Sequence, residues 1–255
     1  MKYGFIGTGN MGGALATACA KAVEPESILL SNRSPEKARA LAEKLGASCA
    51  DNETIARDCD VIFLGVKPYM VADVLAPARE ALAGKAVVSV AAGLLFDFYE
   101  DLLGAGSHHL STIPNTPIAV GCGVIACEQK HSLSDDEWET FAGLFGGIAL
   151  IEPVAGHLLS TASAVAGCGP AFAAMFLESL ADGGVKNGLP RATAYRLAAQ
   201  MMAGTAQLHL TTGTHPGAMK DAVCSPGGTT IKGVAALEAA GLRNALISAV
   251  DATLQ

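Results

Sequence analysis

The chain has 255 residues, of which 51% are hydrophobic and only 16% are charged. This length allows one large or two modest domains, and the apolar composition predicts a large core and a buried subunit interface. The formal net charge of −7 opposes a nucleic-acid partner, because nucleic-acid phosphates attract basic surfaces.

A glycine-rich motif follows the first predicted strand. The apolar run 3–6 leads into Gly-x-Gly-x-x-Gly, and a helical pattern of small residues comes next. In this order of strand, turn and helix, Gly7 allows the tight turn, Gly9 lets the backbone approach a pyrophosphate, and Gly12 lets the helix lie close to the strand. The N-terminus of the helix then attracts phosphate. We therefore predict a dinucleotide site, rather than a purely structural turn, at Ile6, Gly7, Thr8, Gly9, Asn10, Met11 and Gly12.

Strand and helix patterns alternate over residues 1–152. A helix is predicted from Pro35 to Leu45, because proline favours the first helical position and Gly46 ends the pattern. Continuous apolar runs are typical of parallel strands covered on both faces, and they occur at residues 27–31, 60–66, 86–90, 110–113, 123–126 and 148–151. This alternation predicts an α/β domain, Rossmann-like and doubly wound.

The residues after the second strand predict which dinucleotide binds. An NAD-preferring site has an acidic residue about 20 positions past the glycines, whereas this chain has Asn32, Arg33 and Ser34 there. Arg33 can pair with a 2′-phosphate, helped by Lys37, although both could also belong to a solvated helix start. We predict NADP(H) as the preferred cofactor, with NAD(H) possible.

Further cofactor contacts are expected where other strands end. Ligands of open α/β sheets lie beyond the carboxyl ends of the strands. That rule selects Asn52, Val66, Lys67, Pro68, Ala91, Ala92 and Gly93. Lys67 is the most specific of these candidates, because it is a cation just past a buried strand, although a surface lysine with no cofactor contact would fit the same position.

Strand patterns stop after Pro153, and residues 153–255 predict an all-helical domain of five or six helices. Pro170 and Pro190 stand where helices are expected to begin. Residues 153–177 contain no charged residue, but Ser160 and the break at Gly167–Pro170 favour two buried helices over a membrane span. We therefore expect no membrane association.

A second ligand-binding pattern lies near the C-terminus. Ser225, Gly227, Gly228, Thr229 and Thr230 precede a helix predicted over residues 231–238, and their backbone N–H groups can hold a carboxylate. The same stretch could be an ordinary helix start with a Pro-Gly turn.

Several stretches together resemble the pyrroline-5-carboxylate reductase family, in the same order over essentially the whole chain. They are Phe5–Gly12, Val66–Pro68, Pro114–Pro117, Gly167–Phe172, His215-Pro216 with Lys220-Asp221, and Ser225–Ile231 through Leu237-Glu238. The Ser-Pro-Gly-Gly-x-Thr element is the most specific. Cys168 departs from the pattern, because the family usually has serine there.

The resemblance implies reduction of 1-pyrroline-5-carboxylate, a small cyclic imino acid, to L-proline in the last step of proline biosynthesis. It implies a homo-oligomer, a dimer or a multiple of dimers, built through the helical domain, with substrate held between one subunit's cofactor and its partner. Thr230 matches the family's active-site threonine, which would hydrogen-bond the imine nitrogen. The substrate contacts are expected from the carboxylate-binding stretch described above, namely Ser225, Gly227, Gly228, Thr229 and Thr230.

Three alternatives stay open. The first is a reductase of a related cyclic imine, including a six-membered ring. The second is a β-hydroxyacid dehydrogenase, disfavoured because the helix from Pro170 has no lysine before Lys186. The third is a non-catalytic NADP-binding regulatory protein, which would not need a substrate cradle.

The cysteines and histidines predict no metal. The seven cysteines contain no Cys-x-x-Cys pair and no histidine partner at metal-ligand spacing, so we expect reduced thiols in a cytoplasmic protein. No signal peptide is expected, because functional sequence begins at Lys2. His108 and His109 precede a strand away from the cofactor, and Asn115 is expected to fix a loop rather than act in catalysis.

Overall fold

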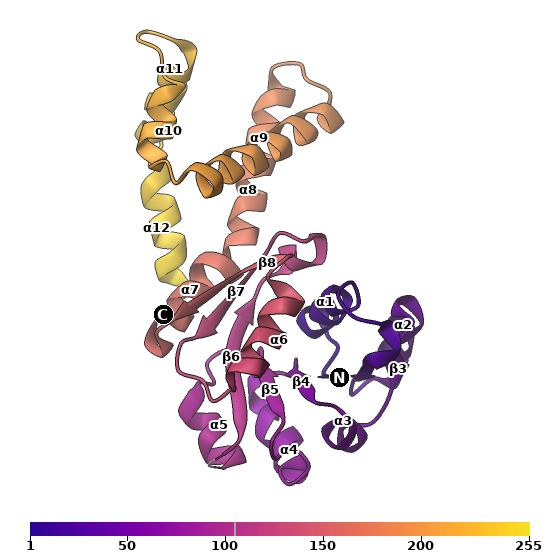
Figure 1. Cartoon of the computed structure of the whole chain (residues 1–255). Helices are drawn as coiled ribbons and strands as arrows, with labels where there is room; N and C mark the ends of the chain where they lie inside the picture. The colour runs from indigo at the N-terminus through magenta and orange to yellow at the C-terminus, as the bar shows by residue number, and fades with distance from the viewer. Residues whose placement is uncertain (105) are drawn as a thin grey trace. The chain divides into compact units, whose positions relative to one another are not determined.

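The computed structural model describes residues 1–104 and 106–255 (Figure 1). It divides into two compact units, Met1–Gly167 and Cys168–Gln255. The predicted boundary at 152/153 lies earlier than this division. The last strand runs to Val154, and the segment after it still packs on the sheet, since Leu159 and Ala164 are buried.

The N-terminal unit contains an eight-stranded sheet in the order β3-β2-β1-β4-β5-β6-β7-β8. All neighbouring strands pair in parallel except β6 and β7. The order reverses direction at β1, so the chain winds first to one side and then to the other, which confirms the doubly wound α/β prediction. The strands are β1 Tyr3–Ile6, β2 Ile28–Ser31, β3 Ser48–Cys49, β4 Val61–Leu64, β5 Ala86–Ser89, β6 His108–Pro114, β7 Gly123–Glu128 and β8 Ala149–Val154.

Helices cover both faces of this sheet and bury alternate strand residues (Figure 1). On one face Phe5 and Phe63 stack at 4.7 Å, and Phe145 meets Phe63 edge-on at 5.6 Å. On the other face Ile62 packs among residues from α3, α4 and α5. The helices are α1 Asn10–Cys19, α2 Pro35–Leu45, α3 Asn52–Asp58, α4 Val71–Leu75, α5 Phe96–Leu103, α6 Asp135–Phe145 and α7 Leu159–Ala162.

Local signals explain where several of these helices begin and end. Pro35 occupies the first turn of α2, and Gly46 ends it in the left-handed conformation at φ +72°. The Asp51 carboxylate accepts the Thr54 N–H at 2.7 Å and caps α3. These signals fix both ends of α2, as the sequence predicts, and the start of α3.

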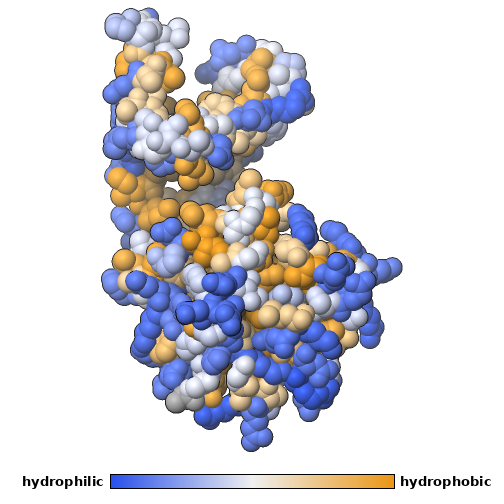
Figure 2. Space-filling model, viewed as in Figure 1, coloured by the Kyte–Doolittle hydropathy of each residue, from blue (hydrophilic) through white to orange (hydrophobic). Residues whose placement is uncertain are grey.

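The C-terminal unit is entirely helical, as predicted. It contains α8 Gly169–Lys186, α9 Arg191–Thr212, α10 Pro216–Ala222, α11 Thr229–Ala239 and α12 Leu242–Ala252. Pro170 lies in the first turn of α8, and Pro190 is the N-cap of α9. Figure 2 shows apolar residues at the surface of this unit, where Met175, Leu197 and Leu210 are 68%, 57% and 69% exposed.

The charge-free stretch breaks where the sequence predicts. A helical run from Gly156 to Lys186 has the length and the mean hydropathy, 1.4, of a membrane-crossing helix, and α11 with α12 would pass as one span bent by 47°. A π-helical turn at Ser163–Gly167 and a bend at Cys168 interrupt the run. The expectation that both of its helices are buried is wrong for the single chain, because Ala181 is the one buried residue of α8.

Candidate cofactor and substrate sites

The glycine motif forms a tight turn between β1 and α1. Gly7 has φ +93°, and a Cβ there would lie 2.7 Å from the backbone of Gly65. A Cβ on Gly12 would collide with the carbonyl oxygen of Gly7, so only glycine lets the helix lie this close to the turn. An added Cβ on Gly9 meets no atom within 4 Å and would point into open space.

The N-terminus of α1 is open to an anion. Its N-cap, Gly9, provides no side-chain hydrogen bond, and the first turn contains no acidic residue. The unpaired N–H groups and the helix dipole favour a negative group at this position. This turn therefore fits a dinucleotide pyrophosphate.

A cleft of about 1130 Å³ lies at the carboxyl ends of β1, β2 and β4. It brings together nine of the predicted cofactor residues: Ile6, Gly7, Gly9, Asn32, Arg33, Ser34, Asn52, Val66 and Lys67. The other eight do not line it: Thr8, Asn10, Met11, Gly12, Pro68, Ala91, Ala92 and Gly93. The cleft thus gathers the residues expected around the adenosine and the pyrophosphate.

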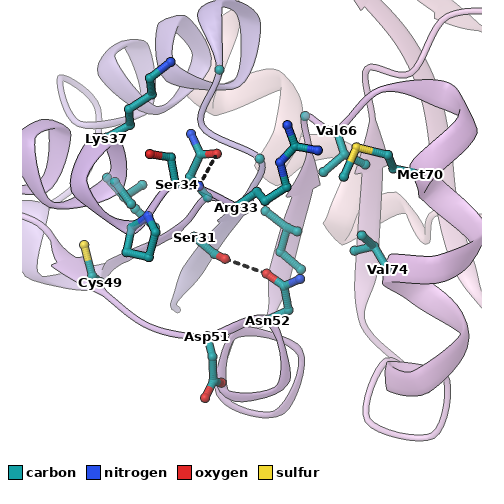
Figure 3. A pocket seen from close by; sticks show the side chains of 18 of the residues that line it. Ser31, Arg33, Ser34, Lys37, Cys49, Asp51, Asn52, Val66, Met70 and Val74 are labelled. Carbon is teal, nitrogen blue, oxygen red and sulfur yellow. Dashed lines mark hydrogen bonds between the residues drawn. The ribbon is translucent and has the colours of Figure 1, made fainter.

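Cations are concentrated on the side of the cleft formed by the end of β2 and by α2. Arg33, Lys37 and Arg39 line it, and Figure 3 shows the Arg33 side chain extending towards Val66 and Met70. The carboxylate of Asp51 also lines the cleft, but it is engaged as the cap of α3, and this hydrogen bond to the Thr54 N–H lowers its pKa. The cationic side suits a 2′-phosphate.

Asn32 connects the two cofactor loops. Its Nδ2 donates to the carbonyl oxygen of Thr8 at 3.1 Å, and its Oδ1 accepts the backbone N–H of Ser34 at 3.3 Å. On the same strand end, Ser31 Oγ donates to Asn52 Oδ1 at 2.5 Å (Figure 3). The side chain of Asn32 therefore positions the loop that contains Arg33 against the glycine turn.

Several residues of the cleft carry no motif and were not predicted. Arg39 lies one helical turn after Pro35, and that spacing could have suggested it. Met70 and Val74 form an apolar wall, and Tyr69, Cys49, Asp51 and Glu53 also belong to the lining. These residues follow the strand ends by distances that no sequence rule fixes.

The predicted substrate loop belongs to the helical unit. Gly227 has φ +69°, and the N–H of Gly228 donates to the carbonyl oxygen of Ser225 at 3.0 Å, which closes the turn. The helix α11 starts two residues earlier than predicted, so Thr229 and Thr230 lie in its first turn and are exposed. The N-cap, Gly228, provides no side-chain cap, and no acidic residue occupies this turn. Its free N–H groups fit a carboxylate.

The remaining candidates have structural contacts. Asn115 donates from Nδ2 to the carbonyl oxygen of Ala166 at 3.0 Å and accepts the N–H of Val124 at 2.8 Å, so it fixes its loop as expected. His108 pairs with Glu137 at 2.8 Å. Within residues 1–104 and 106–255, no group of three His, Cys, Asp or Glu side chains could hold a metal ion.

Comparisons with known proteins cover the whole chain. Residues 157–255 match the family model for pyrroline-5-carboxylate reductase dimerisation, and residues 2–93 match the model for NADP oxidoreductase, coenzyme F420-dependent. The chain is 44% identical to pyrroline-5-carboxylate reductase of Treponema pallidum, over 100% of this chain and 99% of that protein. It is 37% identical to the Escherichia coli protein of the same name, over 100% and 96%. The structure of Plasmodium falciparum pyrroline carboxylate reductase with NADP bound matches with a TM-score of 0.87 at 30% identity, over 99% of this chain and 95% of that one.

Proposed function

This chain belongs to the pyrroline-5-carboxylate reductase family, and we propose that it reduces 1-pyrroline-5-carboxylate to L-proline with NADPH, the last step of proline biosynthesis. The observation that carries the proposal is the 44% identity over the full length of a named reductase. A carboxylate-binding helix start and a dinucleotide cleft in the same chain support it. The enzyme is thus an oxidoreductase acting on a CH–NH bond.

NADP(H) is the preferred cofactor in this proposal. The glycine turn Gly7–Gly12 would hold its pyrophosphate, and Arg33, Ser34 and Lys37 would hold its 2′-phosphate. When bound, the cofactor supplies the hydride that reduces the C=N carbon. Cationic residues on the α2 side of the cleft support the choice of NADPH over NADH, although NADH can still enter the same cleft.

The Ser225–Thr230 stretch would hold the substrate. Backbone N–H groups at the start of α11 would bind the substrate carboxylate, and the exposed hydroxyl of Thr230 would hydrogen-bond the imine nitrogen. A cyclic imine can arrive already protonated at nitrogen, so the protein needs to orient it rather than supply a strong acid. Because Ser225, Gly227, Gly228 and Thr229 contribute backbone groups, the carboxylate hold depends on the turn more than on side chains.

The helical unit makes the chain a homo-oligomer. We propose a dimer, or a multiple of dimers, as its form. The exposed apolar residues of the helical unit, such as Met175 and Leu197, support this, because water-exposed apolar surface on this scale marks an interface. We also propose a cytoplasmic location, which the free cysteines support.

An assay of NADPH oxidation tests the proposal. NADPH should be consumed with 1-pyrroline-5-carboxylate and more slowly with the six-membered ring analogue. In a separate control, no 3-hydroxyacid should be oxidised with reduction of NADP⁺ to NADPH. A comparison of Michaelis constants for NADPH and NADH tests the cofactor. Tight NADPH binding without turnover on either imine would instead support a regulatory protein.

A further inference from the structure

One buried carboxylate has no role in the proposed reaction. Glu128 is the last residue of β7, and it is only 4% exposed. Carboxylates are rarely buried to this extent unless a specific partner holds them. The Oε2 atom of Glu128 accepts the backbone N–H of Phe96 at 2.7 Å. This side chain therefore holds a residue of another element.

Phe96 is the first residue of α5. The N-cap of this helix is Leu95, which has no polar side chain to cap it. Glu128 supplies the missing acceptor from the neighbouring strand, and its charge suits the N-terminus of a helix. The contact thus fixes the point at which the loop Ala91–Leu95 enters α5.

Buried polar groups hold the other end of the same loop. Ser89 ends β5 and is 2% exposed. Its Oγ accepts the N–H of Ala91 at 3.2 Å and shares a hydrogen bond of 2.5 Å with the Tyr99 hydroxyl of α5. Its carbonyl oxygen accepts the Thr112 hydroxyl at 2.9 Å. The loop is therefore fixed at both ends by side chains that water does not reach.

The structure leaves room for the carboxylate and for little else. A Cβ on Gly156 would lie 2.5 Å from Oε1 of Glu128, so any larger residue there would displace the carboxylate. Burial raises the pKa of Glu128, and the hydrogen bond from Phe96 N–H acts in the opposite direction. Burying a carboxylate costs the free energy of removing it from water. We take this cost as a sign that Glu128 has a role that an apolar side chain could not fill.

The loop lies at the edge of the sheet where the cofactor cleft opens. The strand β5 pairs with β4, and Val90 N–H donates to the carbonyl oxygen of Leu64 at 3.0 Å. Val66 and Lys67, directly after β4, line the cleft. The loop Ala91–Leu95 therefore follows the carboxyl end of β5, the strand next to β4. It lies on the side of the cleft away from β2, which faces the adenosine.

We propose that Glu128 is a positioning residue that fixes the loop Ala91–Leu95 at the nicotinamide end of the cofactor site. It acts by accepting the Phe96 N–H and does not touch the reacting atoms. This role rests on the proposed function, because it assumes that a nicotinamide lies beyond β5. Without the acceptor, the loop would shift and the hydride donor would lose its alignment with the substrate.

The experiment compares Glu128→Ala and Glu128→Gln in the full-length chain. Glutamine keeps an acceptor oxygen for Phe96 N–H, whereas alanine removes it. Asp97→Ala is the matched control, because Asp97 is also an acid in the first turn of α5 but its side chain is 87% exposed and pairs with Lys130. The readouts are kcat, the Kd of NADPH, and amide hydrogen exchange of a peptide that covers residues 91–96.

We expect Glu128→Ala to lower kcat by about tenfold, as expected for the loss of one hydrogen bond, with the Kd of NADPH nearly unchanged. Hydrogen exchange of residues 91–96 should rise in the same variant, and Glu128→Gln should restore both values. If Glu128→Ala does not fold, Gly156→Ala provides the second test, since it displaces the carboxylate while Glu128 remains.

Unchanged hydrogen exchange in residues 91–96 would overturn the proposal, and so would equal losses of kcat in the alanine and glutamine variants. A lower melting temperature with unaltered kcat would reduce Glu128 to a structural residue. Failure of the wild-type chain to reduce 1-pyrroline-5-carboxylate would refute the proposed function instead, and hydrogen exchange would still decide whether Glu128 holds the loop.

Discussion

The two units of this chain differ in how they are stabilised. The N-terminal unit buries large side chains such as Phe5, Phe63 and Phe145 on both faces of its sheet. Among the described residues of the helical unit, the buried apolar side chains are three alanines, at positions 181, 194 and 198. Alanines of this kind remove too little apolar surface from water to offset the entropy of ordering five helices. The first unit has a core of its own, whereas the second matches a dimerisation family model and leaves its large apolar side chains exposed in the single chain.

The largest expected effect separates the two units by stability. Phe63→Ala should lower the free energy of unfolding by about 3–5 kcal/mol, because it leaves a cavity between Phe5 and Phe145. Leu197→Ala should instead lower the free energy of unfolding by an amount that grows as the protein is diluted. Leu197 is 57% exposed in the single chain, so its contribution to stability would come from a contact between subunits. Denaturant unfolding at several protein concentrations measures both. A concentration-independent effect of Leu197→Ala would remove the contrast.

The second prediction separates the units by chemistry. Thr230→Ala should lower turnover about a hundredfold or more, because it removes the hydroxyl proposed to hold the imine nitrogen. NADPH binding should stay nearly the same, since the cofactor cleft belongs to the other unit. Steady-state kinetics and NADPH titration measure the two effects, and Thr229→Ala is the control one residue away. Full turnover in Thr230→Ala would leave the helical unit without its assigned catalytic residue.

The third prediction concerns cofactor choice in the N-terminal unit. Arg33→Ala should weaken NADPH binding by about 1.5–3 kcal/mol and NADH binding much less, because only NADPH carries the 2′-phosphate. Arg57→Ala is a suitable control, since Arg57 is exposed and pairs with Asp58 outside the cleft. Equal losses for both dinucleotides would show that Arg33 acts on a shared part of the cofactor.

The smallest expected effect is a pH dependence confined to the N-terminal unit. Burial lowers the pKa of His109, which is 1% exposed, and its contact with Glu100 at 3.1 Å opposes this only partly. The unfolded chain therefore binds a proton at a higher pH than the folded chain does. The contribution of His109 to stability is complete above about pH 6.5 and is lost as the pH falls below that value. Denaturant unfolding of His109→Gln between pH 5 and 7 should vary less than wild type, and His157→Gln, which alters an exposed histidine, should follow wild type.

Much of the fold could be predicted from local sequence patterns. Gly7, Gly12, Pro35 and Gly46 have conformational requirements that depend on near neighbours, and the structure contains the turn and the helix that they imply. Seven of the eight strands could be predicted because each contains a short apolar run, whereas β3, Ser48–Cys49, is too short and too exposed to be seen. The all-helical second unit could be predicted because strand patterns end. These features are local.

The missed features depend on contacts between distant residues. Glu128 is 32 positions from Phe96, and no motif marks either residue. The hydrogen bond from Asn32 to the carbonyl oxygen of Thr8 spans 24 positions, and no local pattern predicts this contact between two loops of the cleft. The division into units at 167/168 likewise depends on packing, because Leu159 and Ala164 follow the last strand and are buried within the first unit.

The order of the two units along the chain has a consequence for biosynthesis. The N-terminal unit has its own core and can fold while the ribosome is still adding the helices, since domains form as they emerge. The helical unit emerges after it, with few buried side chains of its own, and its apolar side chains such as Met175 remain in water until a second chain arrives. The final folding step is therefore bimolecular, so the yield of active enzyme depends on how many copies are synthesised at one time and place.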